Sequence, residues 1–189
     1  MQRLLILASK SPRRRALLKK LRIPFRVLPS HVSEHSDEKR PHKLVQELAL
    51  RKAQSVAKKF KAGTVVGADT LVFLGAKILG QPKDAKEAYQ MLYRLSGSTH
   101  RVLTGVAVVD VQSGEFFVDY AESRVRMKKM PLEMIMKLSM KHLDKAGSYA
   151  IQEKKDPIAK VISGSYDNVV GLPVSLVKKL LAQLRAKAC

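Results

Sequence analysis

The sequence has no tryptophan, one cysteine, and only five tyrosines and five phenylalanines in 189 residues. The lone cysteine, Cys189, excludes a disulfide within the chain, and no Cys/His cluster has the spacing of metal ligands. Few aromatic side chains also argue against a surface that stacks many bases. The apolar segment 4–8 is too short for a signal sequence or a membrane span, so we expect no membrane association and a cytoplasmic location.

Acidic residues are scarce as well. Lys and Arg number 36 against 16 Asp and Glu, which gives a formal net charge of +20. This excess attracts any polyanion, whether nucleotide, nucleic acid or anionic membrane, and an ordinary solvated surface rich in lysine explains it equally well. The charge alone therefore identifies no partner.

Two common nucleotide-binding patterns are missing. The sequence contains neither the P-loop pattern G-x-x-x-x-G-K-[ST] nor the dinucleotide-binding pattern G-x-G-x-x-G. It therefore gives no support for an ATP-driven motor or a dinucleotide-binding enzyme. No repeat, low-complexity tract or linker divides the chain, and 46% of its residues are hydrophobic. We therefore expect one domain over residues 1–189 with a sizeable core.

The order of the apolar segments predicts a mixed α/β sheet, because strands alternate with helices and one long hairpin follows. Ser11 and Pro12 predict a helix start, and Asp84 with Glu87 resembles a capping box. The expected elements are strands at 4–8, 25–28, 64–66 and 159–162, an extended segment at 71–74, a hairpin of 101–111 and 115–127, and helices at 12–21, from 41, 84–95, 131–142 and 172–186.

The first strand-to-helix junction carries the strongest chemical signal. Ser9, Ser11, Arg13, Arg14 and Arg15 gather where free backbone N–H groups and the helix dipole favour an anion. Cationic side chains are unfavourable beside a helix N-terminus unless an anion is bound there. Arginine forks match phosphate oxygens, so this junction predicts a phosphate site that includes Ser9 and Arg14. A basic first turn facing solvent is the alternative.

Three further residues fit phosphate chemistry. Asp69 follows a Val-rich strand, where it could hold a divalent cation or act as a general base, although Asp is also common in turns. Lys52 falls on the apolar stripe of the helix that begins at Pro41, so it either snorkels to water or meets an anion. Glu34 is a possible metal ligand in an acidic loop of the kind that is usually solvated.

The motifs resemble those of the Maf family and lie in the family's order over nearly the whole chain. They are Leu7-Ala8-Ser9 with Ser11-Pro12-Arg13-Arg14, Gly67-Ala68-Asp69-Thr70, Leu95-Ser96-Gly97 with His100 and Val102, Asp144-Lys145-Ala146-Gly147 with Ile151-Gln152, and Gly164-Ser165-Tyr166 with Val170-Gly171-Leu172-Pro173.

This resemblance implies a fold shared with inosine-triphosphate pyrophosphatases: an elongated, curved mixed sheet flanked by helices around a central cleft. It also implies hydrolysis that releases pyrophosphate, dependent on Mg²⁺, Mn²⁺ or Co²⁺, by a homodimer. Asp69 matches the family's proposed proton acceptor. Arg13, Glu34 and Lys52 match positions that the family uses around the phosphates and the metal, so the implied metal ligands are Glu34 and Asp69.

Within the family, the chain resembles the dTTP/UTP pyrophosphatase branch. Arg13, Thr70 and Gln152 occupy the positions that select the base in that branch. An amide such as Gln152 both donates and accepts, as the O4/N3–H edge of uracil or thymine requires. Gln81 is a departure, because the family commonly has lysine before this proline. The absence of that lysine removes one phosphate contact, which Lys83 or Lys77 could restore.

The sequence therefore predicts an enzyme that hydrolyses dTTP and UTP to the monophosphate and pyrophosphate, with modified pyrimidine nucleotides as a further candidate substrate class. The alternative is a weakly active or regulatory Maf-like protein linked to arrested cell division, with non-specific nucleic-acid binding. The missing nucleic-acid motifs and the scarcity of aromatic residues disfavour that alternative.

Overall fold

The computed structural model describes residues 4–141, 143, 145–151 and 158–187. In chain order the elements are β1 (Leu5–Leu7), α1 (Pro12–Leu18), η1 (Lys19–Leu21), β2 (Phe25–Val27), α2 (Pro41–Ala57), β3 (Thr64–Leu74), β4 (Lys77–Leu79), α3 (Ala85–Leu95), β5 (Thr99–Asp110), β6 (Phe116–Met127), α4 (Leu132–Ser139), η2 (Ala146–Ser148), β7 (Ala159–Ser163), α5 (Tyr166–Val170) and α6 (Val174–Lys187).

The strands form one mixed sheet, in the order β2-β1-β3-β5-β6-β7, with β4 paired to β3. β1 runs parallel to both of its neighbours, and its Leu5 lies opposite Phe25 of β2 and Thr64 of β3. β4 is antiparallel to β3, and β7 is antiparallel to β6. The predicted mixed α/β sheet flanked by helices is confirmed.

The chain divides into two compact units. The first comprises the residues up to Asp69, Thr104–Ala121 and the residues from Gly171 onward. The second comprises Thr70–Leu103 and Glu122–Val170. The chain passes from one unit to the other within β3, β5 and β6, and just before α6.

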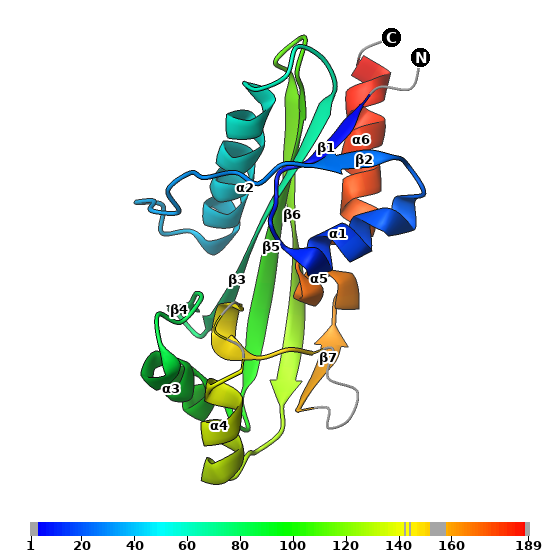
Figure 1. Cartoon of the computed structure of the whole chain (residues 1–189). Coiled ribbons are helices and arrows are strands. Elements are labelled where there is room, and N and C mark those ends of the chain that lie inside the picture. Colours follow the sequence, from blue (N-terminus) through cyan, green and yellow to red (C-terminus); the bar gives the residue numbers. More distant parts are fainter. Residues whose placement is uncertain (1–3, 142, 144, 152–157, 188–189) are drawn as a thin grey trace. The chain divides into compact units, whose positions relative to one another are not determined.

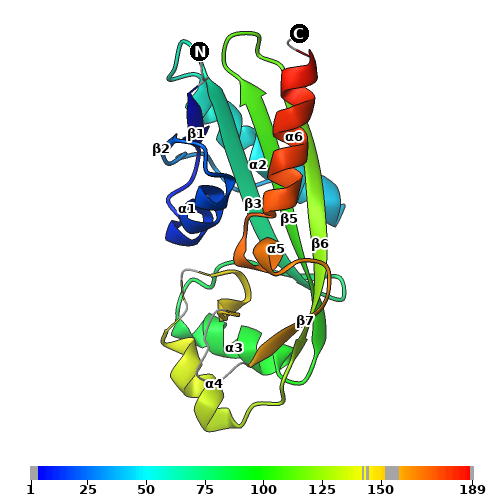
Figure 2. The same cartoon turned by 90° about the vertical axis from the view of Figure 1, so that its right-hand side faces the viewer.

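In the first unit, α2 and α6 cover opposite faces of the sheet (Figures 1 and 2). Small residues of α2, Ala49 and Ala53, pack with strand residues into a buried apolar cluster. A Cβ at Gly67 of β3 would overlap the carbonyl oxygen of Ala49, and one at Gly105 of β5 would overlap that of Val45. Glycine at these two positions therefore lets the backbone of α2 lie directly on the sheet.

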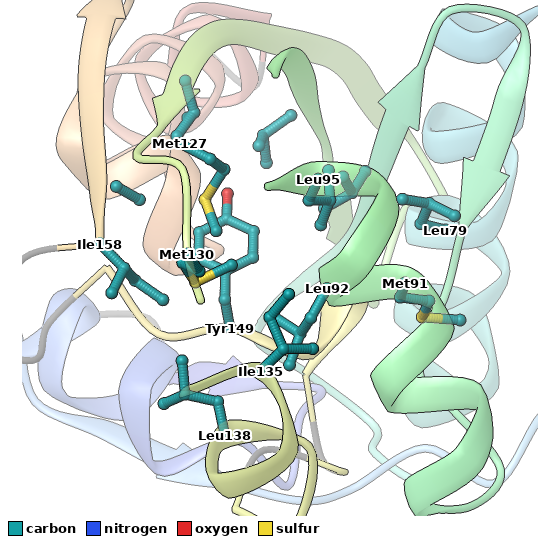
Figure 3. Packing of buried hydrophobic residues seen from close by; sticks show 14 residues of the cluster. Leu79, Met91, Leu92, Leu95, Met127, Met130, Ile135, Leu138, Tyr149 and Ile158 are labelled. Carbon is teal, nitrogen blue, oxygen red and sulfur yellow. The ribbon is translucent and has the colours of Figure 1, made fainter. Parts of the chain in front are cut away.

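In the second unit, α3 packs against α4 over a second apolar cluster. Figure 3 shows Leu92 of α3, Ile135 and Leu138 of α4, and the ring of Tyr149 in this cluster. Asp84 caps α3 by accepting a hydrogen bond from the backbone N–H of Glu87 at 2.7 Å. The predicted cap is therefore confirmed.

The structure corrects one predicted boundary that bears on function. We expected a strand to end at residue 66, with Asp69 just past it, but β3 continues without interruption to Leu74. The glycine that suggested a break, Gly67, instead marks the close approach of α2 within the strand. Asp69 is nevertheless beyond the pairing with β1, because that pairing ends at Val66.

Several smaller boundaries also differ. The helix predicted over 131–142 is shorter, and α6 starts two residues later than expected. β4, η2 and α5 were not predicted, because segments of three to five residues show no clear periodicity. Among the described residues, no helix combines the length and apolarity needed to cross a bilayer.

Candidate active site

The turn between β1 and α1 is built by two serine hydroxyls. The Oγ of Ser9, which is buried, accepts a hydrogen bond from the backbone N–H of Ser11 at 3.2 Å. The Oγ of Ser11 in turn accepts from the backbone N–H of Arg14 at 3.4 Å, which makes Ser11 the predicted N-cap with Pro12 at the first helical position. These bonds and Pro12 define where α1 begins, and therefore where its arginines lie along the helix.

Arg14 is hydrogen-bonded to a residue in the last segment of the first unit. Its Nε donates a hydrogen bond to the carbonyl oxygen of Gly171 at 2.8 Å. Burial lowers the pKa of the Arg14 guanidinium, while the nearby carboxylates of Asp69 and Glu34 raise it. Arginine stays protonated in proteins, so a fixed cation lies within electrostatic reach of both carboxylates. Arg13, the residue before it, is half-buried, and its charge also lowers the pKa of Arg14.

Lys52 and Asp69 form a buried ion pair between α2 and β3. The Nζ of Lys52 donates to Oδ1 of Asp69 at 2.5 Å. Lys52 is only 9% exposed and Asp69 only 4%. The contact depends on the close packing at Gly67, because this glycine brings the backbone of α2 within reach of the strand two residues before Asp69.

Glu34 completes the cluster from the loop before α2. Its Oε1 accepts a second hydrogen bond from Nζ of Lys52 at 2.6 Å, although 62% of the Glu34 side chain is exposed. Partial burial raises the pKa of the Glu34 carboxyl, but the hydrogen bond and charge of Lys52 outweigh this effect and leave the pKa below its ordinary value. The charges of Arg14 and Lys10 act in the same direction.

The expected anion for Lys52 is therefore present, and Lys52 does not snorkel to water. One ammonium joins two carboxylates, and the charge of the half-buried Arg14 acts on both. The rest of the acidic loop is separate, because Glu38 pairs with Arg40 and this pairing lowers the pKa of Glu38 to about 2. Two carboxylates with converging cations suit the binding and hydrolysis of a phosphate ester.

Thr70 and Gln81 belong to the second unit, whereas Glu34, Lys52 and Asp69 belong to the first. Thr70 follows Asp69 in β3 as a half-buried residue. Gln152 lies outside the described residues. Gln81 is exposed in the segment between β4 and α3.

Three residues that shape the site, Lys10, Gly67 and Gly171, were not assigned these roles from the sequence. The carbonyl of Gly171 holds Arg14 across 157 positions, and the charge of Lys10 acts on Glu34. Gly171 lies in a recognised motif, but no local pattern connects a backbone carbonyl with an arginine so far away. Gly67 is the third, because its packing role depends on which helix covers the strand.

A buried polar pair in the second unit was also unexpected. Nε2 of His100 lies 2.7 Å from the hydroxyl of Tyr149, and His100 is only 1% exposed. Burial lowers the pKa of His100 to about 4 and raises the pKa of Tyr149 above its ordinary value. Both side chains are therefore neutral near pH 7, and they link β5 to the residue that follows η2.

Comparison with known proteins gives relatives over almost the full length. A protein named dTTP/UTP pyrophosphatase from Elusimicrobium minutum is 42% identical over 179 residues, which are 95% of this chain and 97% of the relative. A protein of the same name from a Thermoanaerobacter species is 45% identical and covers 94% of both chains. A third, from Ruminiclostridium cellulolyticum, is 38% identical and covers 97% of both.

A solved structure and a family model agree with these relatives. The Ham1 protein of Staphylococcus aureus has a TM-score of 0.55 at 14% identity, with 95% of this chain and 98% of the other covered, which supports the fold alone. The model of the family described as Maf-like protein matches residues 4–184. These residues contain every predicted site residue and the whole Lys52 cluster, and the chain belongs to the Maf family.

Proposed function

We propose that this chain hydrolyses dTTP and UTP to the nucleoside monophosphate and pyrophosphate. The relatives that carry this name are 38–45% identical and match nearly the whole chain. The observation that carries the proposal is the ammonium of Lys52 bonded to both Glu34 and Asp69, with the guanidinium of Arg14 close by. Such a group of charges is suited to a polyphosphate and to the water that attacks it.

In the proposed reaction a water molecule attacks the α-phosphorus. The bond between that phosphorus and the oxygen bridging to the β-phosphate breaks, and pyrophosphate leaves. Asp69 accepts the proton of the water, because its carboxylate is buried on β3 within the group of charges that binds the phosphates. Ser9, Arg14 and Lys52 bind the phosphates, with Arg14 held in place by Gly171.

A divalent cation fits the donor set. Glu34 and Asp69 supply carboxylate oxygens that reach one common cation, the ammonium of Lys52. Hard cations such as Mg²⁺, Mn²⁺ or Co²⁺ take such ligands, and when bound they neutralise phosphate charge. Protein stripped with EDTA should be inactive and should recover on addition of one of these ions.

Arg13, Thr70 and Gln152 form the proposed selectivity set, through the resemblance to the dTTP/UTP branch. Removing the amide of Gln152, as in Gln152→Leu, should raise KM for UTP, because a base edge would lose its donor and acceptor partner. Unchanged KM for UTP and dTTP would remove Gln152 from base recognition.

The deciding experiment is a panel of the common nucleoside triphosphates, each tested with each metal, with the products identified by chromatography. Release of pyrophosphate from UTP and dTTP, above all other nucleotides, is the expected result. Release of orthophosphate, or inactivity toward the whole panel, would contradict the proposal.

The net charge of +20 favours one second candidate, a regulatory protein that binds nucleic acid. Counterion release makes such binding fall steeply with salt, so a titration with non-specific DNA between low and physiological ionic strength tests it. Homodimerisation and a cytoplasmic location also stay predictions. Light scattering on the purified chain checks the first, and cell fractionation checks the second.

A further inference from the structure

Lys52 holds the position where the two proposed metal ligands converge. Its Nζ lies 2.5 Å from Asp69 Oδ1 and 2.6 Å from Glu34 Oε1, so the ammonium is itself the shared cation of the two carboxylates. The side chains of Lys52 and Asp69 are 11% and 6% exposed. A metal ion that reached both carboxylates would have to compete with this ammonium.

The chain alone offers few other ligands. Among the described residues, no group of three His, Cys, Asp or Glu side chains could hold a metal ion. Mg²⁺ and similar ions commonly take one or two carboxylates and complete their coordination with water and substrate phosphates. Glu34 and Asp69 are therefore an incomplete set that a nucleotide can complete.

Displacing Lys52 has a second consequence. The backbone of α2 lies against β3 at Gly67, so the stem of Lys52 starts from a buried face of the helix. An ammonium pushed off both carboxylates in this setting would be a buried charge without a partner, which is unfavourable. A phosphate that arrives together with the metal would give this ammonium a new anion.

We propose that Lys52 is the resident cation of the metal-free site, and that the divalent ion enters as a metal–nucleotide complex. This inference rests on the proposed function, since it takes a nucleotide as the ligand. In this exchange Glu34 and Asp69 would hold the metal and Lys52 would move its hydrogen bonds to a phosphate, so every charge would keep a partner of opposite sign. Metal alone binds weakly, and nucleotide and metal bind with strong mutual enhancement.

The test measures Mn²⁺ binding by the electron paramagnetic resonance of free Mn²⁺, with no turnover involved. Wild-type protein is titrated alone and with α,β-methylene-UTP, which cannot be cleaved at the reacting bond; a nucleotide-only titration subtracts its own binding of Mn²⁺. We expect the protein–nucleotide mixture to bind Mn²⁺ at least about tenfold more tightly than the protein alone, a factor that corresponds to 1.4 kcal/mol.

The variant Lys52→Met removes the ammonium and keeps an unbranched side chain as long as the aliphatic stem of lysine. It should bind Mn²⁺ without nucleotide at least about tenfold more tightly than wild type, because both carboxylates lose their competing cation. Lys179→Met is the matched control: it removes one positive charge from an exposed ion pair with Asp119, and it should bind Mn²⁺ like wild type. Adding Asp69→Asn to Lys52→Met should abolish the gain.

Three results would overturn the inference. They are wild type binding Mn²⁺ equally well with and without the nucleotide analogue, a gain equally large in Lys179→Met, and a gain that survives Asp69→Asn. If Lys52→Met does not fold, the wild-type titrations with and without the nucleotide analogue still test the inference. Inactivity in the nucleotide panel would refute the proposed function separately, because these titrations do not depend on turnover.

Discussion

Lys52 and Asp69 illustrate what a single residue reveals before a structure is known. An ammonium on an apolar helical stripe predicts either snorkelling or a nearby anion, and burial on α2 beside Asp69 settles that choice. The motif around Asp69 also indicated its chemistry. The sequence could not supply the geometry, because the partner residues are 17 and 18 positions away from Lys52 on other elements.

Asp69→Asn should reduce turnover of UTP by about 100- to 10,000-fold, the usual contribution of a positioned general base. The amide keeps the shape of the side chain but cannot take the proton of water. Nucleotide binding in the absence of metal should change much less, which equilibrium titration of metal-free protein with α,β-methylene-UTP measures.

Asp119→Asn provides the matched control, since it makes the same chemical change in an exposed ion pair with Lys179. It should keep wild-type turnover. Full activity in Asp69→Asn, or an equal loss in both variants, would remove Asp69 from the mechanism.

Gln81→Lys should raise kcat/KM for UTP by about tenfold or more, because a charge-assisted hydrogen bond to phosphate contributes roughly 1.5–3 kcal/mol. The family commonly has lysine at this position. Ala76→Lys, in the exposed turn between β3 and β4, adds the same charge elsewhere and should have little effect. Equal gains in the two variants would indicate general attraction and no specific contact.

His100 should make stability depend on pH. Its pKa of about 4 in the folded chain is below its ordinary value of 6.5, so the unfolded chain binds the proton more readily. The stability from the neutral form is complete above pH 6.5 and decreases as the pH falls toward 4, by about 3.5 kcal/mol in all at about 1.4 kcal/mol per pKa unit. Tyr149, its hydrogen-bond partner, stays neutral throughout this range.

Urea unfolding between pH 7 and pH 4.5 measures this dependence, above the range in which Glu38 takes up its proton. His100→Gln should be less stable at pH 7 but should lose most of the pH slope. His31→Gln, at an exposed histidine, should keep the slope. If the pH dependence of the free energy of unfolding persists in His100→Gln, carboxylates and not His100 cause it.

At the scale of elements, periodicity and caps predicted the longer helices and the hairpin. Pro12 after Ser11, and Asp84 before Glu87, mark helix starts through local chemistry that needs no tertiary contact. Gly67 misled the prediction of β3, because the same residue serves as a strand break or as a site of close packing. Only the position of α2 distinguishes these two roles.

Gly67→Ala should therefore destabilise the chain by about 1–3 kcal/mol, the usual cost of overpacking. The added methyl group would overlap the carbonyl of Ala49 and lie 2.8 Å from the backbone nitrogen of Ala53. α2 must then move away from β3, which lengthens the Lys52–Asp69 contact and lowers turnover.

Gly80→Ala is the control for this change, because a Cβ there meets nothing within 4 Å. Its midpoint of urea unfolding and its turnover should match those of wild type. If Gly67→Ala behaves in the same way, the close packing of α2 on the strand is not needed to hold Lys52 in place.

At the scale of the whole molecule, the net charge of +20 acts on every approaching anion. A polyphosphate is attracted over about one Debye length, roughly 10 Å at 0.1 M salt and 3 Å at 1 M. The local site contains two carboxylates as well as cations, so long-range attraction comes mainly from the surrounding surface. The amino-acid composition therefore predicts this long-range electrostatic attraction, although it does not predict the fold.

Raising KCl from about 0.05 M to 0.5 M should therefore lower kcat/KM for UTP by about tenfold while kcat changes little, since steering acts on encounter and binding. Replacing the exposed residues Lys58, Lys59 and Lys61 with glutamate lowers the net charge by six, from +20 to +14. This triple variant should show a lower kcat/KM at low salt and a shallower salt dependence, and the same kcat. If the triple variant shows the same salt dependence of kcat/KM as wild type, the attraction of UTP comes from the arginines of α1. The excess surface charge would then serve another partner.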